Sequence, residues 1–194
     1  MRKAKIERKT KETEIELEIN LDGTGKYEID TKIAFLNHML ELFSKQSLID
    51  LTLKAKGDLE VDEHHTVEDI GICLGLALKK ALGEKKGINR YGNAIIPMDE
   101  SLVLCAVDFS GRGYPVINAE FEREMVGDLP TELIQDFFEA IAFNAGINLQ
   151  IKVFYGRNAH HKIEAMFKSF AKAVKNAVEL DKRTQGVPST KGIL

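Results

Sequence analysis

Apolar side chains recur at helical spacing in two similar segments of the chain. Residues 64–83 read HHTVEDIGICLGLALKKALG, and residues 160–179 read HHKIEAMFKSFAKAVKNAVE, 96 residues later. In both segments the apolar residues fall three and four positions apart, which places them on one face of an α-helix. The pattern therefore predicts two amphipathic helices with equivalent starts.

A second repeated pattern lies ahead of each of these helices. Residues 35–55 and the segment that starts at Glu132 each change from helical spacing to strict alternation of apolar residues. This change predicts a helix followed by a strand in both places. In this alignment His38 of the first copy corresponds to Asp136 of the second.

Alternating apolar and polar residues also flank a Gly-x-Gly turn twice, at 14–30 and at 101–121. Such a pattern indicates two strands joined as a hairpin. Each half therefore reads β-β-α-β-α, and we expect an α+β duplication whose sheets and helices pack about a pseudo-twofold axis. The expected divisions are 1–86 for the first half, 87–180 for the second half and 181–194 for a C-terminal tail, all within one compact functional unit.

The composition narrows the class of protein. Hydrophobic residues make up 44% of the chain, charged residues make up 29%, and the net charge is −3. These values are typical of a folded globular domain, and the charge favours neither nucleic acid nor a membrane surface as a partner. Neither a leader segment nor a membrane-spanning segment is predicted, so we expect a cytoplasmic protein. Cys73 and Cys105 lie in apolar runs and are expected to be core residues.

The histidines have an unusual distribution. Four of the five belong to two copies of a His-His-x-x-Glu motif, and the fifth, His38, lies on a preceding helix. Glu68 is four residues after His64 and three after His65, so either ring can share a helix face with it. Adjacent histidines diverge by about 100°, however, and are poorly placed to chelate one ion. The equivalent residues of the second copy are His160, His161 and Glu164.

We therefore expect two metal sites, each drawing one histidine from each copy together with a glutamate. His38 and its counterpart Asp136 would complete them. Imidazole and carboxylate ligands without thiolate suit Mn²⁺, Fe²⁺, Co²⁺ or Zn²⁺, and mixed nitrogen and oxygen ligands favour Mn²⁺. The alternative is that the two motifs are hydrogen-bonded clusters that begin helices.

Several short segments carry charged or hydroxyl side chains, and all but one of them contain glycine. They lie at residues 22–25, 89–93, 97–101, 110–113 and 188–192. Arginine, lysine and hydroxyl groups beside glycine suit a phosphate, because the backbone lets the anion approach while the side chains donate charged hydrogen bonds. Each of these segments taken alone is also typical of an ordinary turn or tail.

With these residues in view, the sequence resembles the imidazoleglycerol-phosphate dehydratase family, from Arg8 to Gly192. The resemblance rests on a series of motifs in one order: LDGTG, FLNHML, DEHHTVED, PMDES, DFSGRG, YGRNAHHKIEA and PSTKG. It implies the family's layered α/β sandwich, a fold similar to that of some ribosomal proteins. It also implies a hydro-lyase of histidine biosynthesis, which converts imidazole glycerol phosphate to imidazole acetol phosphate.

The resemblance also implies roles for individual residues. The implied metal ligands, for two Mn²⁺ ions per subunit, are His38, His64, His65, Glu68, Asp136, His160, His161 and Glu164. The implied phosphate-binding residues are Arg90, Arg112, Ser189, Thr190 and Lys191. Glu12 would lie near the reacting carbons and, with Glu68 and Glu164, take part in catalysis. The chain departs from the family pattern at Asp136, often a histidine in relatives, and at Leu42, Gln46 and Glu63.

The implied chemistry explains why such residues are needed. The proton to be removed lies on a carbon without an adjacent carbonyl, so the substrate's imidazole has to supply electrons. Two cations on the ring nitrogens stabilise an imidazolate, which expels the hydroxyl as water through a diazafulvene-like intermediate. A carboxylate such as Glu12 then takes the next proton. The family's assembly of 24 subunits built from trimers, with sites between subunits, is implied as well.

Two other functions remain open from the residues. A two-metal phosphoester hydrolase would use its ions to activate water, and it predicts metals about 3.5–4 Å apart with a bridging ligand. A non-catalytic metal-binding shell protein would explain the repeated histidines. It would leave Arg90, Arg112 and the PSTKG segment without a role.

Overall fold

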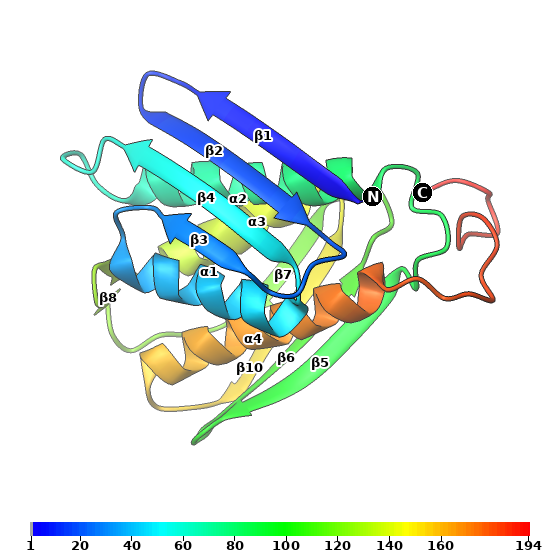
Figure 1. Cartoon of the computed structure of the whole chain (residues 1–194). Coiled ribbons are helices and arrows are strands. Elements are labelled where there is room, and N and C mark those ends of the chain that lie inside the picture. The colour runs from blue at the N-terminus through cyan, green and yellow to red at the C-terminus, as the bar shows by residue number, and fades with distance from the viewer. Residues whose placement is uncertain (1) are drawn as a thin grey trace.

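The computed structural model describes residues 2–194, which form four helices and ten strands (Figure 1). The elements of the first half are β1 (Lys3–Lys9), β2 (Thr13–Asn20), β3 (Tyr27–Asp30), α1 (Ala34–Ser47), β4 (Asp50–Gly57) and α2 (His64–Leu82). Those of the second half are β5 (Tyr91–Met98), β6 (Ser101–Asp108), β7 (Tyr114–Asn118), β8 (Met125–Val126), β9 (Leu129–Pro130), α3 (Leu133–Ala145), β10 (Asn148–Tyr155) and α4 (Ala159–Val178). The α+β class and the internal duplication are confirmed.

Each half forms one four-stranded sheet, in the order β1-β2-β4-β3 and β5-β6-β10-β7. β4 lies between β2 and β3, antiparallel to the first and parallel to the second, and β10 has the same place between β6 and β7. The predicted hairpins around the Gly-x-Gly turns are therefore wrong. β4 pairs with β2 along all eight residues, whereas β3 has only four residues to offer. Pairing β2 with β4 thus gives more backbone N–H and C=O groups a hydrogen-bond partner than a hairpin of β2 with β3 would.

One strand precedes the predicted elements in each half. β1 and β5 lie at the edges of their sheets, so the observed repeat is β-β-β-α-β-α, and the second half has the additional two-stranded sheet β8-β9 inserted before α3. In β1 only Ala4 is buried, and most of its neighbours are charged. In β5 the apolar Ile95 and Ile96 are consecutive. Neither pattern gives the alternation that identifies a half-buried strand.

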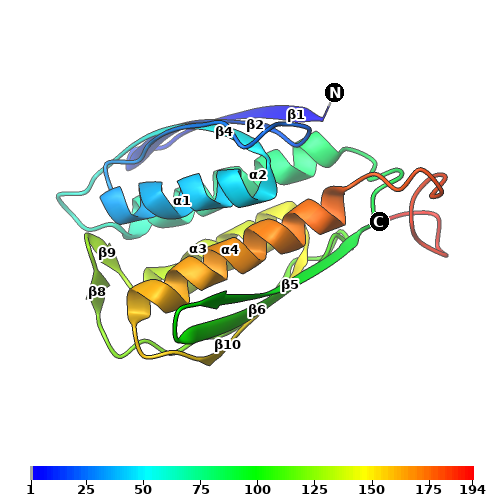
Figure 2. The same ribbon diagram turned by 60° about the horizontal axis from the view of Figure 1, so that its bottom comes forward.

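The two sheets lie outermost and the helices lie between them (Figure 2). α1 and α2 cover the inner face of the first sheet, and α3 and α4 cover that of the second. Across the middle, α2 packs against α3 and α1 packs against α4. Rotation about a pseudo-twofold axis exchanges these two pairs, because α1 corresponds to α3 and α2 to α4. Two layers of helices, one from each half, thus meet between the two sheets.

Two glycines allow α2 to approach α3 closely. A Cβ atom on Gly71 would lie 2.8 Å from the carbonyl oxygen of Phe137, and one on Gly75 would lie 2.8 Å from that of Ile141. Any larger residue would force the helix backbones apart, since carbon and oxygen atoms do not approach so closely without bonding. The glycines therefore set the spacing of these two helices, which carry four of the predicted metal ligands.

Equivalent side chains begin the two helices that carry the histidine motifs. Asp62 Oδ1 accepts the backbone N–H of His64 at 2.8 Å, and Asn158 Oδ1 accepts that of His160 at 2.9 Å. These bonds satisfy N–H groups that lack partners within the helix. Each motif therefore occupies the first turn of its helix, and its orientation is fixed from the start.

The two sets of repeated elements end at Leu82 and Val178. The division of the chain at residues 86 and 180 stays a prediction. Among residues 2–194, the structure has no helix with the length and apolar composition needed to cross a membrane.

Candidate active site

Three predicted metal ligands meet where the start of α4 faces α1. His160 Nε2 lies 3.1 Å from Glu164 Oε2, and His38 Nε2 lies 3.8 Å from the same oxygen. One ligand atom of each residue lies within 4.8 Å of the others. Two imidazole nitrogens and a carboxylate oxygen form a donor set that fits a divalent transition-metal ion. We call these three residues the His160 cluster.

The carboxylate of the His160 cluster is held in its ionised form. The side chain of Glu164 is only 9% exposed, and Lys168 Nζ lies 2.5 Å from its Oε1. Burial alone raises the pKa of Glu164, but the hydrogen bonds and charges of Lys168 and His160 outweigh burial and lower that pKa. The ionised carboxylate is the form that binds a metal ion.

The equivalent residues of α2 and α3 form a more open group, the His64 cluster, which consists of His64, Glu68 and Asp136. His64 Nδ1 lies 3.6 Å from Asp136 Oδ2, and His64 Nε2 lies 3.9 Å from Glu68 Oε2. The three side chains are 39–48% exposed. The two carboxylates face different nitrogens of one ring, so these ligands lie side by side without converging as tightly as those of the His160 cluster.

The second histidine of each motif turns toward a loop. His65 Nδ1 lies 3.1 and 3.2 Å from the two carboxylate oxygens of Asp58, and His161 Nδ1 lies 2.7 Å from Glu100 Oε2. Each cluster therefore takes one histidine and one glutamate from a single motif, and its third member from a helix of the other half. The expected combination of one histidine from each motif does not occur in either cluster within residues 2–194. Ligation of metal by all eight residues stays a prediction.

The carboxylate that holds His161 is itself fixed by the backbone. Glu100 Oε1 accepts the N–H groups of Arg157 and Asn158 at 3.2 and 2.9 Å. The hydrogen bond from His161, followed by that from Asn158, lowers the pKa of Glu100 to about 2. In the first half, the hydrogen bond to Asp58 raises the pKa of His65. Both histidines are thus bonded to carboxylates.

Glu12 lies in the turn between β1 and β2, beside His65. Its Oε1 is 3.9 Å from His65 Nε2, and its side chain is 54% exposed. The backbone around it is anchored, because its N–H donates to Thr10 Oγ1 at 3.1 Å and its carbonyl oxygen accepts the N–H of Asp58 at 3.0 Å. The turn thus holds an accessible carboxylate next to a predicted metal ligand.

All five residues expected to bind phosphate line one pocket of about 830 Å³. These residues are Arg90, Arg112, Ser189, Thr190 and Lys191. Tyr91 and Ser110, from the predicted turns at 89–93 and 110–113, also line it. The pocket combines two guanidinium groups, one ammonium group and hydroxyl groups, a composition that suits an anion.

The guanidinium nitrogens of Arg90 form hydrogen bonds within the chain. Its Nε lies 2.7 Å from Asp108 Oδ1, its Nη2 lies 3.2 Å from Asp108 Oδ2, and its Nη1 donates to the carbonyl oxygen of Pro188 at 3.0 Å. The first and largest cause of the raised pKa of Arg90 is its hydrogen bond to Asp108. Arg90 therefore anchors the C-terminal tail, and the side chains of Arg112 and Lys191 have no ion-pair partner within residues 2–194.

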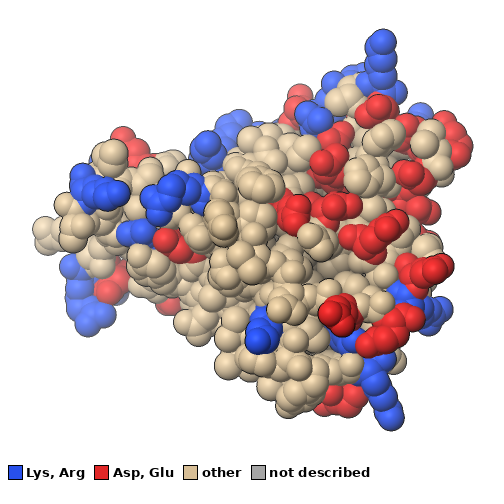
Figure 3. All heavy atoms as spheres, turned by 180° about the vertical axis from the view of Figure 1, so that it is seen from behind, with Lys and Arg blue, Asp and Glu red and all other residues tan. Residues whose placement is uncertain are grey.

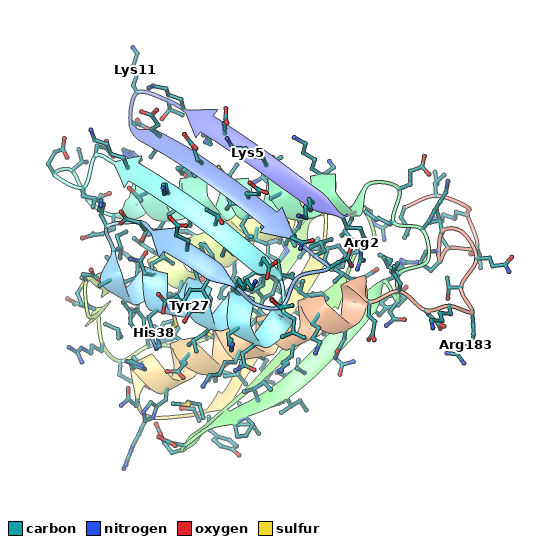
Figure 4. All side chains as sticks on the ribbon, in the orientation of Figure 1. Arg2, Lys5, Lys11, Tyr27, His38 and Arg183 are labelled. Carbon is teal, nitrogen blue, oxygen red and sulfur yellow. The ribbon has the colours of Figure 1, made fainter. Side chains whose placement is uncertain are left out.

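The pocket and the clusters lie at opposite ends of the helices. The N–H of Arg90 donates to the carbonyl oxygen of Ala177 in the last turn of α4, whereas His160 lies in the first turn. The helix between them spans about 26 Å at about 1.5 Å per residue. In Figure 4, His38 of α1 lies at one end of the molecule, and Arg183, which belongs to the C-terminal tail, lies at the opposite end. In Figure 3, which views the molecule from behind, Asp and Glu gather toward the end that carries the clusters.

The structure also places partners that sequence reasoning missed. Lys168 lies four residues after Glu164, so helical spacing could have identified that ion pair. Asp58 and Glu100 lie in connections between elements, and no periodic pattern links them to His65 and His161. Only folding brings these loops to the starts of the helices.

The chain is similar along nearly its whole length to proteins of one kind. A sequence profile described as imidazoleglycerol-phosphate dehydratase matches residues 31–174. The imidazoleglycerol-phosphate dehydratase of Acetivibrio thermocellus is 58% identical over 193 residues, which cover 100% of this chain and 99% of the relative. That of Clostridium kluyveri is 57% identical and covers 100% of both chains.

Two solved structures have the same fold. The crystal structure of the dehydratase from Staphylococcus aureus subsp. aureus N315 matches with a TM-score of 0.84 and 39% identity, covering 92% of this chain and 99% of that one. The Pyrococcus furiosus enzyme, in complex with (S)-C348, matches with a TM-score of 0.85 and 39% identity, covering 97% and 100%. Together with the two histidine motifs and the basic pocket, these matches show that the chain belongs to the imidazoleglycerol-phosphate dehydratase family.

Proposed function

We propose that this chain, a hydro-lyase that dehydrates imidazole glycerol phosphate to imidazole acetol phosphate in histidine biosynthesis, depends on metal ions for this reaction and works in the cytoplasm. The observation that carries the proposal is the presence of two pseudo-equivalent clusters of imidazole and carboxylate groups in a family member. A substrate with an imidazole ring has two nitrogens, and two clusters offer one metal site for each.

Two Mn²⁺ ions per chain are the proposed cofactors. The His160 cluster and the His64 cluster would each hold one, together with His65 and His161. When bound, such ions supply positive charge that stabilises negative charge on the imidazole ring. The ionised carboxylates of Glu68 and Glu164 would balance the charge of the ions and keep them in place.

The chain supplies the proton acceptor and a means of orienting the substrate. We assign the proton transfer at the glycerol carbons to Glu12, because its exposed carboxylate lies 3.9 Å from His65 Nε2 on an anchored turn. A general base must lie within reach of the proton that it removes, and a fixed backbone limits the search for that geometry.

The pocket at the other end of the chain would hold the phosphate. Arg112 and Lys191 would provide charge, while Ser189 and Thr190 would provide hydroxyl donors. Arg90 would keep the tail in position through its contacts with Asp108 and Pro188. These residues suit a dianion, because guanidinium and ammonium groups donate strong, charge-assisted hydrogen bonds.

The separation of the two ends supports a site that is shared between two copies of the chain. A three-carbon chain joins the imidazole to the phosphate in this substrate, and it is far shorter than the roughly 26 Å of helix between His160 and Ala177. One chain therefore cannot bind both ends of one substrate molecule. We propose that the pocket of one copy completes the cluster region of a neighbour, within an assembly of 24 subunits built from trimers.

The outer faces of the two sheets support such an assembly. The second sheet exposes the apolar side chains of Ile95, Val116 and Phe154, by 55%, 43% and 44%. On the first sheet, Lys5 instead forms ion pairs with Glu7 and Glu16. An apolar face gains free energy when another copy covers it, whereas a charged face is stable in water. The second sheet is therefore the face that we assign to contacts between copies.

The clusters do not favour the two-metal hydrolase. That enzyme class needs a ligand that bridges two closely spaced ions. Among residues 2–194, no carboxylate lies within 4.0 Å of histidines from both clusters. Separate clusters instead suit an imidazole ring bound through both of its nitrogens.

The test is to load the purified protein with Mn²⁺, add imidazole glycerol phosphate and measure the ketone product with and without a chelator. We expect product only with metal, and light scattering should give the mass of a 24-subunit particle. Failure to form product under metal-replete conditions would contradict the function. A monomer with full activity would contradict the shared site and leave the reaction assignment intact.

A further inference from the structure

The second histidine of each motif makes the same contact through the same ring nitrogen. His161 Nδ1 lies 2.7 Å from Glu100 Oε2, and His65 Nδ1 lies 3.1 and 3.2 Å from the oxygens of Asp58. An ionised carboxylate only accepts hydrogen bonds, so the nitrogen that faces it must carry the proton. In a neutral ring, Nε2 then keeps its lone pair.

The two carboxylates come from connections that are not equivalent in the duplication. Asp58 lies between β4 and α2, whereas Glu100 lies in the turn between β5 and β6. The connection between β10 and α4, at residues 156–158, corresponds to that of Asp58 and contains no carboxylate. The contact to Nδ1 was therefore not simply copied when the half was duplicated. Its appearance from two different loops indicates a requirement of the histidine.

Glu100 is built to hold one orientation. Oε1 is occupied by the backbone N–H groups of Arg157 and Asn158, which leaves Oε2 for His161. Gly156 brings the two loops together, because a Cβ atom there would lie 2.3 Å from Ser101 Oγ. The β5–β6 turn is thus packed against the start of α4, and its carboxylate has little freedom to move.

The Nε2 atoms have no hydrogen-bond partner within residues 2–194. His161 Nε2 lies 3.6 Å from Asp99 Oδ2, and His65 Nε2 lies 3.9 Å from Glu12 Oε1, both beyond hydrogen-bond distance. A ring that is held on one side and has a free lone pair on the other is the arrangement of a metal-ligating histidine whose second nitrogen bonds to a carboxylate.

We propose that Glu100 and Asp58 are positioning residues, which fix the Nδ1–H tautomers of His161 and His65 and so present each Nε2 to a divalent metal ion. The inference rests on the metal sites of the proposed function. It adds the groups that orient two of the ligands and predicts which nitrogen of each ring binds.

The two carboxylates differ in a way that sharpens the test. In Glu100→Gln the amide oxygen can still accept the two backbone N–H groups, which turns the NH₂ group toward His161. That group donates to Nδ1 and selects the Nε2–H tautomer, which blocks the ligand. In Asp58→Asn the amide can turn its oxygen toward His65, because both oxygens of Asp58 face the same nitrogen.

The first measurement is Mn²⁺ titration calorimetry of the full assembly. Glu100→Gln is expected to weaken binding of one Mn²⁺ by about 10- to 100-fold, the usual effect of removing a carboxylate behind a metal-ligating histidine. Asp58→Asn should have a smaller effect. The matched control is Glu122→Gln. Glu122 forms an ion pair at 2.9 Å with Lys162, which lies on α4 next to His161, and within residues 2–194 it forms no ion pair with a histidine. This variant should bind both ions as tightly as the wild type.

The second measurement reads the tautomer without metal, from ¹⁵N ring signals of histidine-labelled protein. The His161 signals, identified by their loss in His161→Gln, should show protonation at Nδ1 in the wild type and at Nε2 in Glu100→Gln. A wild-type ring protonated at Nε2, or a folded Glu100→Gln variant whose Mn²⁺ affinity stays within twofold of wild type, would overturn the inference. If Glu100→Gln does not fold, the same test is made on the other pair: the His65 ring should be protonated at Nδ1 in the wild type and should lose this preference in Asp58→Ala. Wild-type protein that binds no Mn²⁺ contradicts the proposed function instead, and the tautomer result still decides the role of Glu100.

Discussion

The N-terminal and C-terminal halves carry equivalent metal-ligand clusters in different surroundings. Glu164 is 9% exposed and pairs with Lys168, whereas the equivalent Glu68 is 48% exposed. The position that corresponds to Lys168 in the first half is Ile72, which cannot pair with a carboxylate. Duplication thus kept the ligands at the same places on the helices, while later substitutions gave each cluster its own burial and charge.

The helices that carry these clusters pack in different ways. Gly71 and Gly75 allow α2 and α3 to touch through their backbones, whereas the equivalent positions of α4 are Phe167 and Ala171. The ring of Phe167 packs against that of Phe137, with the ring centroids 5.3 Å apart. The same fold therefore reaches a close-packed centre with glycine in one half and with an aromatic ring in the other.

The largest expected effect comes from the two glutamates. Glu164→Gln and Glu68→Gln should each remove one Mn²⁺ per chain and lower kcat by more than about 100-fold. Loss of a residue that only hydrogen-bonds to a metal ligand already lowers metal affinity or activity by about 10- to 100-fold, and these two residues are predicted to be ligands themselves. Only Glu164→Gln should also destabilise the metal-free protein, by about 1–2 kcal/mol, since it leaves Lys168 without its carboxylate. Metal content, turnover and urea denaturation measure these effects. Equal stability of the two variants would show that the difference in burial has no energetic consequence.

Helix packing gives the next effect in size. Gly75→Ala should lower the free energy of unfolding by about 1–3 kcal/mol, because its Cβ would lie 2.8 Å from the carbonyl oxygen of Ile141. The counterpart Ala171→Gly should cost only about 1 kcal/mol, from the lower helix propensity of glycine. Thermal unfolding of both variants is the measurement. A stabilised Gly75→Ala variant would mean that propensity outweighs the close approach.

The smallest effect concerns the loop after the second strand of each half. Asp50 accepts the N–H groups of Thr24 and Lys26 at 2.8 and 2.9 Å, whereas the equivalent Asn148 donates to Ser110 Oγ at 3.3 Å. Burial raises the pKa of Asp50, but these N–H donors outweigh it and lower that pKa. Asp50→Asn should therefore reduce stability at pH 7 by about 1 kcal/mol.

The pH dependence of that loss has a definite sign. A carboxyl whose pKa is lower in the folded state stabilises the protein above its unfolded pKa, and this contribution disappears as the pH falls through the folded pKa. The difference between wild type and Asp50→Asn should therefore shrink below the ordinary aspartate pKa of 3.8. Urea denaturation at a series of pH values measures it, with Asn148→Asp as the matched variant. A difference that stays constant into acid would contradict the role of the charge.

The helices and the interior strands were predictable because their apolar residues follow one clear period. The edge strands β1 and β5 were missed, since they bury few side chains and their sequences carry little alternation. The crossover around β4 was also missed. Hydrogen bonds between strands form across the sheet, and a turn motif such as Gly-x-Gly does not determine which strand becomes the neighbour.

The sequence alone determined the duplication, the helical placement of both histidine motifs and the divergence of adjacent histidines, because these depend on local period. Only the tertiary structure decided that His38 joins His160 and Glu164, that His65 and His161 bond to Asp58 and Glu100, and that the basic pocket lies at the far ends of the helices. These contacts join residues far apart along the chain. Helix packing and loop closure set their distances, and neither leaves a periodic signal in the sequence.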